Sequence, residues 1–273
     1  MPVTSTALVA RRDYLDGQRR LIIARAVAGS LAGALPVPFL DDWALERVLG
    51  AGYRRIAAAH GVDVDDDAMK ALVHGRSAPP SVVDLAAAGV ASRVAGRAAS
   101  RMMIALAAVN RARKAAHHFV VMTLFDHYCA KLHVGLGLDG ATALALREEI
   151  SRAIDATPGA LAFHPFRRGI VAAARATLRA PLELADLASR GRLRKLLAKT
   201  SEVTEAEAVD EMDRAVEMAL ANKNGFLGRT VAAVEVQLSA EVNPFLESAL
   251  DNLDRRWRAR IAAQAPQDPK PTP

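Results

Sequence analysis

The clearest pattern with a chemical meaning in this chain of 273 residues is a row of three arginines, Arg93, Arg97 and Arg101. Residues four apart lie along one face of a helix. Alanine, valine, methionine and leucine occupy the other faces of the same segment, so the pattern predicts an amphipathic helix with a basic face. Guanidinium groups in such a row bind phosphate or carboxylate oxygens.

Like charges spaced four residues apart repel each other, so we expect a counter-charge beside these arginines. Lipid phosphate or nucleic acid could supply it from outside the chain, and solvent could screen the repulsion. An acidic segment between residues 202 and 217 could supply it from within. Its acids are Glu202, Glu205, Glu207, Asp210, Glu211, Asp213 and Glu217.

A second pattern combines glycine and proline between residues 26 and 40. Gly29 and Gly33 stand four apart, the spacing at which two helix backbones approach closely in lipid. Glycine inside a helix costs about 1 kcal/mol relative to alanine, so a packing reason is expected. Pro36 and Pro38 then end the helix. Two interpretations stay open: a tight helix pair inside a bundle, and a hairpin whose four glycine and proline residues contact a membrane or a partner.

This segment also carries a resemblance to known proteins. The run Gly33-Ala34-Leu35-Pro36-Val37-Pro38 is followed by Asp41-Asp42, Arg55-Ile56-Ala57 and His60-Gly61-Val62. Over residues 21–64 this resembles the YcjF-like and EcsC-like helical families of unknown function, although His60 stands where an aromatic residue is commoner. The resemblance implies membrane association and, in some members, attachment to a GTPase domain. It brings no catalytic residues with it.

Clustered histidines are the first candidates for a metal site. His117, His118, His127 and His133 share one segment with Asp126. Metal ligands on one helix face stand three or four residues apart, and these histidines do not supply a full set at that spacing. We therefore predict packing and surface roles for them, and no bound metal.

Clustered acids are the second candidates. Asp41, Asp42 and Glu46 could form one half of a magnesium site for isoprenoid diphosphates, but the partner motif on a second helix is missing. The acids at residues 63–67 lack the glycine and terminal glutamate of a calcium-binding loop. Acids at helix N-termini complement the helix dipole, which explains both clusters. We predict no catalytic residues here.

Charge and cysteine content limit the partners and the compartment. The formal net charge is +6, which favours anionic partners. No phosphate-binding loop, nucleophile elbow, helix-turn-helix or zinc-finger signature is present, so we predict no cofactor and no specific nucleic-acid partner. Cys129 is the single cysteine. We therefore expect a reduced, cytoplasmic chain in which Cys129 is a buried small hydrophobe.

The elements that must position these residues are helices. Apolar residues, mostly alanine and leucine, make up 51% of the chain, whereas aromatic residues make up 4%. This composition and the helical period predict an all-α bundle of about nine helices without a sheet. The proline-free stretch 81–135 predicts two helices that meet near Gly96 or Asn110. Asp139 and Asn243-Pro244 predict the starts of two later helices.

We predict a helical region at 1–157 that contains the glycine–proline hairpin, a second helical region at 158–263, and a disordered tail at 264–273. The two helical regions could equally form one continuous domain. The uncharged run at 26–40 is shorter than the roughly 20 residues of a membrane-spanning helix.

The sequence therefore predicts a non-catalytic helical binding protein in the cytoplasm, or peripheral on the inner membrane. Its partner would be a protein, an anionic lipid surface or a second copy of the chain. The alternative is an all-α enzyme or carrier with an apolar pocket for a lipid or isoprenoid.

Overall fold

Alanine- and leucine-rich segments form helices throughout the part of the chain that the structure describes. This structure is a computed structural model, and it describes residues 5–32, 40–75, 100–161, 164–176, 218, 221–222, 225–240 and 244–264. Within these ranges the helices are α1 (Ser5–Ala32), α2 (Leu40–Ala59), α3 (Asp66–His74), α5 (Ser100–Lys131), α6 (Gly140–Asp155), α7 (His164–Ala176), α11 (Phe226–Ala240) and α12 (Pro244–Gln264). The predicted helical class is confirmed, while the number of helices in the whole chain stays a prediction.

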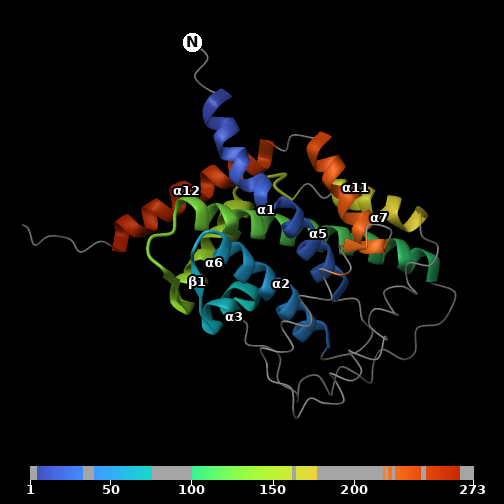
Figure 1. The fold of residues 1–273 in the computed structure, drawn as a ribbon, viewed down its shortest axis with the longest axis horizontal. Coiled ribbons are helices and arrows are strands. Elements are labelled where there is room, and N and C mark those ends of the chain that lie inside the picture. The colour runs from blue at the N-terminus through green and yellow to red at the C-terminus, as the bar shows by residue number, and fades with distance from the viewer. Residues whose placement is uncertain are drawn as a thin grey trace, which may run out of the picture.

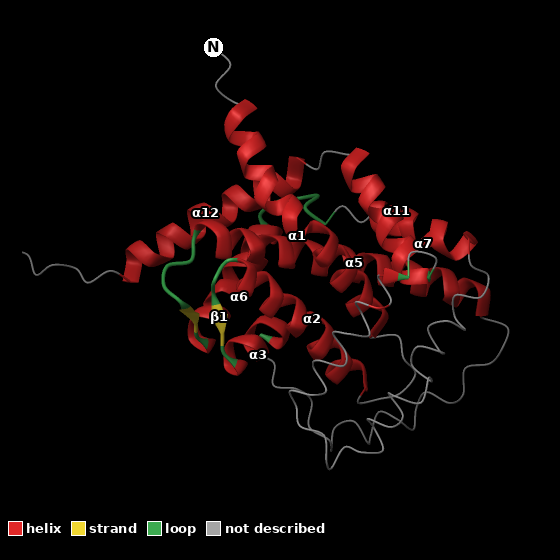
Figure 2. Cartoon of the chain, in the orientation of Figure 1, coloured by secondary structure: helices red, strands yellow, loops and turns green. Residues whose placement is uncertain are grey.

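Two short strands correct the expectation that the chain has no sheet. β1 (Asp63–Val64) and β2 (Gly137–Leu138) pair in parallel, with Asp63 opposite Gly137. Figure 2 shows them side by side as the yellow segments. Each strand has two residues, and hydrophobic alternation becomes visible only over four or more. The pairing depends on how α2 and α5 bring their following loops together, which no local pattern encodes.

Helix α5 lies at the centre of the fold. It packs against α1, α2, α6, α7 and α12. In Figure 1, α2 and α3 lie below it, α7 and α11 lie toward the upper right, and α12 lies toward the upper left. A single cluster of buried apolar residues includes members of all eight helices. The cluster draws residues from both sides of residue 157. The division of the chain into two helical regions near that residue stays a prediction.

Three aromatic contacts connect α5 to three neighbouring helices. Phe119 lies 5.4 Å from Phe166 of α7, and Phe125 lies 5.0 Å from Tyr53 of α2, measured between ring centroids. Tyr128 lies 5.0 Å from Trp257 of α12. Such pairs contribute about 0.5–1.5 kcal/mol each beyond the burial of their area. These six aromatic residues thus lie where helices meet.

One predicted helix boundary is wrong and two others are confirmed. α5 runs through Asn110 without a break, because no glycine or proline interrupts its hydrogen bonds and Asn110 is exposed on its surface. The other predicted boundary, Gly96, lies outside the described residues. Asp139 caps α6 by accepting a hydrogen bond from the Thr142 amide at 2.7 Å. α12 begins at Pro244, as predicted.

Glycines set the distance between several helix pairs. A Cβ on Gly29 of α1 would lie 2.8 Å from Leu49 Cδ2 of α2. A Cβ on Gly169 of α7 would lie 3.1 Å from the backbone nitrogen of Val234 in α11 and closer still to a methyl group of Val234. The Val234 backbone cannot rotate away as a flexible side chain can. The contact between α7 and α11 therefore requires glycine at position 169.

We expect Gly169→Ala to lower the free energy of unfolding by about 1–3 kcal/mol, because the added methyl group overpacks the contact with α11. Gly17→Ala is the matched control, because a Cβ there meets nothing within 4 Å. Inside α1 that change should raise stability by about 0.5–1 kcal/mol. Urea unfolding followed by circular dichroism measures both. Equal effects of the two substitutions would contradict the packing argument.

Candidate functional site

The loop between α5 and β2 exposes two large apolar side chains. Val134 is 90% exposed and Leu136 is 82% exposed, against 64% for Val236, the next most exposed large hydrophobic residue among those described. Single exposed apolar side chains are common on protein surfaces and carry little information, but here two stand together, on either side of Gly135. We call residues 134–136 the apolar loop. Its exposure makes it the first candidate for a binding surface.

The backbone holds the apolar loop at both ends. After α5 the amides of Leu132 and His133 donate to the Tyr128 carbonyl at 2.9 and 2.8 Å. Gly135 has a φ of +109°, a conformation that favours glycine. The Leu136 carbonyl then accepts a hydrogen bond from the Asp63 amide at 2.7 Å. The two side chains are therefore exposed on an anchored backbone.

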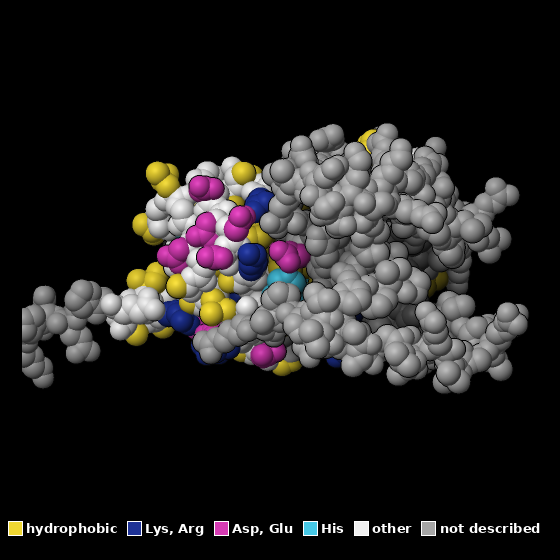
Figure 3. Space-filling view, turned by 90° about the horizontal axis from the view of Figure 1, so that it is seen from below, with side chains coloured by type: hydrophobic (Ala, Val, Ile, Leu, Met, Phe, Trp, Pro, Cys, Tyr) yellow, Lys and Arg dark blue, Asp and Glu magenta, His cyan; other side chains and the backbone are white. Residues whose placement is uncertain are grey.

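Exposed acids stand beside the apolar loop. The backbone amide of Asp63 is hydrogen-bonded to the Leu136 carbonyl in this loop. The first turns of α3 and α6 contact each other close by, since a Cβ on Gly140 would lie 3.1 Å from Asp67 Cβ. Exposed acids on these segments are Asp63, Asp65, Asp66, Asp67 and Asp139. Arg54 pairs with Asp66, and Lys70 is exposed on α3. Acids therefore outnumber cations on these segments, and Figure 3 shows acidic side chains gathered on the described part of the lower face.

Two of these aspartates owe their positions to helix capping. Asp65 accepts a hydrogen bond from the Ala68 amide at 2.6 Å at the start of α3, and Asp139 does the same for α6. The amide hydrogen bonds lower the pKa of Asp139, which keeps this carboxylate charged well into acid. The predicted role of these acids at helix N-termini is confirmed for Asp65 and Asp139.

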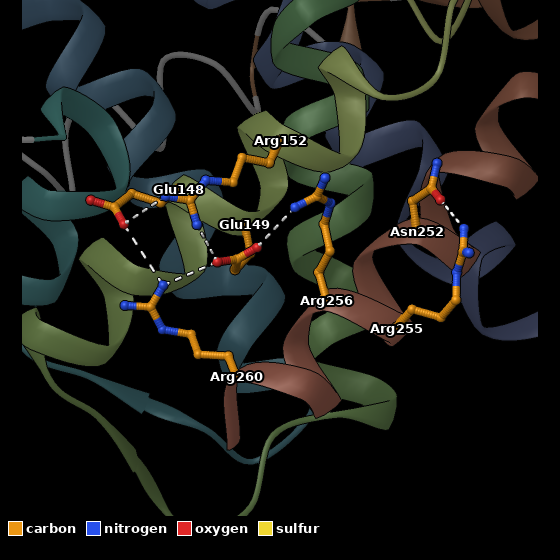
Figure 4. A network of polar contacts seen from close by, with 7 residues as sticks. All are labelled: Glu148, Glu149, Arg152, Asn252, Arg255, Arg256 and Arg260. Carbon is orange, nitrogen blue, oxygen red and sulfur yellow. Dashed lines mark hydrogen bonds and ion pairs between the residues drawn. The ribbon is translucent and has the colours of Figure 1, made fainter. Parts of the chain in front are cut away.

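A network of arginines and glutamates joins α6 to α12 (Figure 4). The carboxylate of Glu149 is 6% exposed and lies 2.6 Å from Arg152, 3.1 Å from Arg260 and 3.7 Å from Arg256. Glu148 also pairs with Arg152 and Arg260. A buried carboxylate needs such partners, because the low-dielectric interior penalises an unpaired charge. The network therefore attaches the last helix to the middle of the chain.

Two buried polar residues of α5, Asp126 and His127, have partners far away in the sequence. His127 Nε2 donates to Asp254 of α12 at 2.5 Å, and Nδ1 accepts from the Tyr14 hydroxyl of α1 at 2.6 Å. His60 Nε2 donates to Asp126 at 2.7 Å. Burial raises the pKa of Asp126, while the hydrogen bond from His60 opposes that shift. Each pair connects α5 to another part of the fold, and for His127 this is the packing role that was predicted.

No group of three or more potential ligands is placed to hold a metal ion within the described ranges. Glu46, one of three acids considered for magnesium, accepts a hydrogen bond from His74 Nε2 at 3.0 Å and so connects α2 to α3. Asp41 and Asp42 lie in the first turn of α2, and their side chains are outside the described part. Cys129 is buried, and burial raises the pKa of its thiol.

The residues predicted to contact a membrane or partner fall mostly outside the described ranges. Gly29 lies in the contact between α1 and α2, beneath Leu45 and Leu49. Arg101 lies in the first turn of α5, but its side chain is not described. Gly33, Pro36, Pro38, Arg93 and Arg97 lie outside the described residues. A membrane or partner contact for these residues stays a prediction.

Comparison with known proteins adds no relative. No family model, curated protein or solved structure matches the chain. The resemblance at residues 21–64 therefore stays a prediction. Of the helices in the described ranges, none has the length and apolar character that crossing a bilayer requires.

Sequence reasoning missed the apolar loop. Val134 and Leu136 stand in the run Val134-Gly135-Leu136-Gly137-Leu138, whose glycines by themselves indicate the end of a helix. Apolar residues that alternate with glycine between two helices are a signal that could have drawn attention to them. The pattern alone does not say which of the three is buried, and the pairing of β2 with β1 decides that Leu138 is.

His118 should make the protein sensitive to acid. Burial, together with the smaller effect of the positive charges of His117, Lys114 and Arg147, lowers its pKa to about 4. A histidine pKa lowered in the folded state gives stability that is complete above about 6.5 and is lost as pH falls toward 4. His118→Gln should therefore lose about 1–3 kcal/mol less between pH 7 and pH 4 than the unmodified chain.

Urea unfolding at several pH values measures this difference. Other titrating groups, including Asp126, are common to both chains and cancel in the comparison. If both chains lose the same stability between these pH values, burial of His118 does not carry the acid sensitivity.

Proposed function

We propose that this protein is a non-catalytic helical binding protein that contacts a partner protein through the apolar loop. The observation that carries the proposal is the exposure of Val134 and Leu136 at 90% and 82%. Burying a valine or leucine side chain is worth roughly 1.5–3 kcal/mol. A backbone anchored at Tyr128 and Asp63 presents both side chains without a further ordering cost, which favours binding.

The surrounding charge indicates the kind of partner. The acids on β1, α3 and the start of α6 would repel an anionic lipid headgroup and attract lysine and arginine side chains. We therefore propose a protein surface in which an apolar pocket is bordered by basic residues. An anionic membrane that binds this chain would instead contact the basic face of Arg93, Arg97 and Arg101. Binding to such a membrane and the cytoplasmic location both stay predictions.

The alternative function, an enzyme or carrier with an apolar pocket for a lipid or isoprenoid, has less support. Its magnesium ligands would be Asp41, Asp42 and Glu46, and Glu46 is engaged by His74. No observation in the described ranges favours this alternative. A second copy of the chain is a further candidate for the occupant of the apolar loop, but the acids of one copy would face those of the other.

A photo-crosslinking residue at position 136 in the full chain tests the proposal in cells. We expect a discrete crosslinked protein whose contact residues, located by mass spectrometry, are apolar and basic. The same residue placed at position 236 is the control, since Val236 is also exposed but belongs to α11. A crosslink to lipid only, to a second copy, or to an acidic surface would contradict the proposed partner.

With the crosslinked partner purified, substitution measures the contribution of each feature. Val134→Ser/Leu136→Ser should weaken binding by at least about tenfold, because two apolar side chains no longer leave water. Val236→Ser/Ile261→Ser makes the same chemical change elsewhere and should leave binding unchanged. Asp65→Asn/Asp66→Asn should slow association and reduce its salt dependence. Equal binding by both serine variants would exclude the apolar loop as the contact.

A further inference from the structure

A hollow of about 250 Å³ lies beside α12 and has no role in the proposal above. Asn252, Arg255, Arg256 and Ala259 line it. These residues stand three, four and seven positions apart, which places them on one face of the helix. The small side chain of Ala259 leaves space between the longer ones. The hollow is therefore a concave surface that combines two guanidinium groups and an amide.

Arg256 is not required to neutralise Glu149. The buried carboxylate of Glu149 already accepts hydrogen bonds from Arg152 at 2.6 Å and from Arg260 at 3.1 Å. Arg256 lies 3.7 Å from it, which is too long for a hydrogen bond, and its side chain is 39% exposed. Figure 4 shows its guanidinium at the edge of the network. Most of its five N–H donors are therefore available to a ligand.

Arg255 is held in place by a neutral group. Its guanidinium donates to the Asn252 amide oxygen, and the Asn252 amide nitrogen donates to the Thr157 hydroxyl at 2.7 Å. The Thr157 hydroxyl donates in turn to the Ala153 carbonyl of α6 at 2.8 Å. This chain of hydrogen bonds orients Arg255 without neutralising its charge. A preoriented arginine loses little side-chain entropy when it binds an anion.

The network as a whole has an excess of positive charge. In Figure 4, Arg152, Arg256 and Arg260 face two carboxylates, Glu148 and Glu149, while the fourth arginine, Arg255, is bonded to the neutral Asn252. A ligand with two negative charges would balance the excess. Arginine binds phosphate oxygens through paired hydrogen bonds, and a phosphate dianion carries the two negative charges that a single carboxylate lacks.

We propose that the hollow beside α12 binds a phosphate group, with Arg255 and Arg256 donating to its oxygens. The phosphate is either free or carried by a lipid as a monoester headgroup. The site does not depend on the apolar loop, so either proposal can fail without the other.

Isothermal titration calorimetry with inorganic phosphate tests the site in the full chain, with chloride at equal ionic strength as the reference. A second arm uses sedimentation with vesicles of phosphatidylcholine, with and without phosphatidic acid. Arg255→Gln should weaken binding by about tenfold, the loss expected for one charge-assisted contact. Arg255→Gln/Arg256→Gln should abolish it. Binding of phosphatidic acid vesicles without binding of free phosphate would identify the lipid-borne source.

Arg258→Gln is the matched control. Arg258 is on the same helix, is 74% exposed and pairs with Asp254, and it does not line the hollow. The substitution Arg258→Gln removes the same charge as Arg255→Gln and should leave phosphate binding unchanged. Arg255→Gln leaves all the partners of Glu149 in place. The single variant therefore still tests the site if the double variant, which also lacks Arg256, fails to fold. Equal loss in Arg255→Gln and Arg258→Gln, or no binding by the unmodified chain in either arm, would overturn the proposal.

Discussion

The structure depends on the need to satisfy two adjacent polar residues in the middle of its most enclosed helix. Asp126 is 0% exposed and His127 is 1% exposed, and both lie on α5. A polar group buried without a partner costs roughly 2–7 kcal/mol by transfer measurements. The turn after α2 supplies His60 to Asp126 Oδ1, while α1 and α12 supply Tyr14 and Asp254 to His127. Helices that could otherwise slide over an alanine-rich surface are held in one register by these bonds.

This constraint explains how an alanine-rich chain can specify one arrangement. Alanine packs closely but with little shape, so many relative positions of two helices bury similar apolar area. Hydrogen bonds and aromatic contacts discriminate between such positions because they are lost when one helix shifts by a turn. The contact between α5 and α12 shows both effects, since the ring of Tyr128 meets Trp257 and the neighbouring His127 donates to Asp254.

Local features of the fold could be predicted from the sequence, and distant pairings could not. The cap at Asp139 and the start of α12 at Pro244 depend on a few neighbouring residues, and both were expected from residue type alone. The partner of His127, in contrast, stands 127 positions away, and no pattern within α5 or α12 indicates it. The same applies to the arginines of α12: their cluster is visible in the sequence, but the separation of Arg256 from Glu149 appears only once α6 and α12 are packed together.

Helix α6 connects the two surfaces for which binding is proposed. Its first turn, capped by Asp139, lies against Asp67 at the start of α3, where acids accumulate beside the apolar loop. Its later turns carry Glu148 and Glu149, which gather the arginines of α12. The N-cap Asp139 and Arg152 in its last turn also match the direction of its helix dipole. The net charge of +6 therefore hides a separation of charge, in which acids gather beside the start of α6 and the arginines of α12 gather against its later turns. A binding protein with this separation can engage a basic partner and an anionic group without either ligand neutralising the other's site.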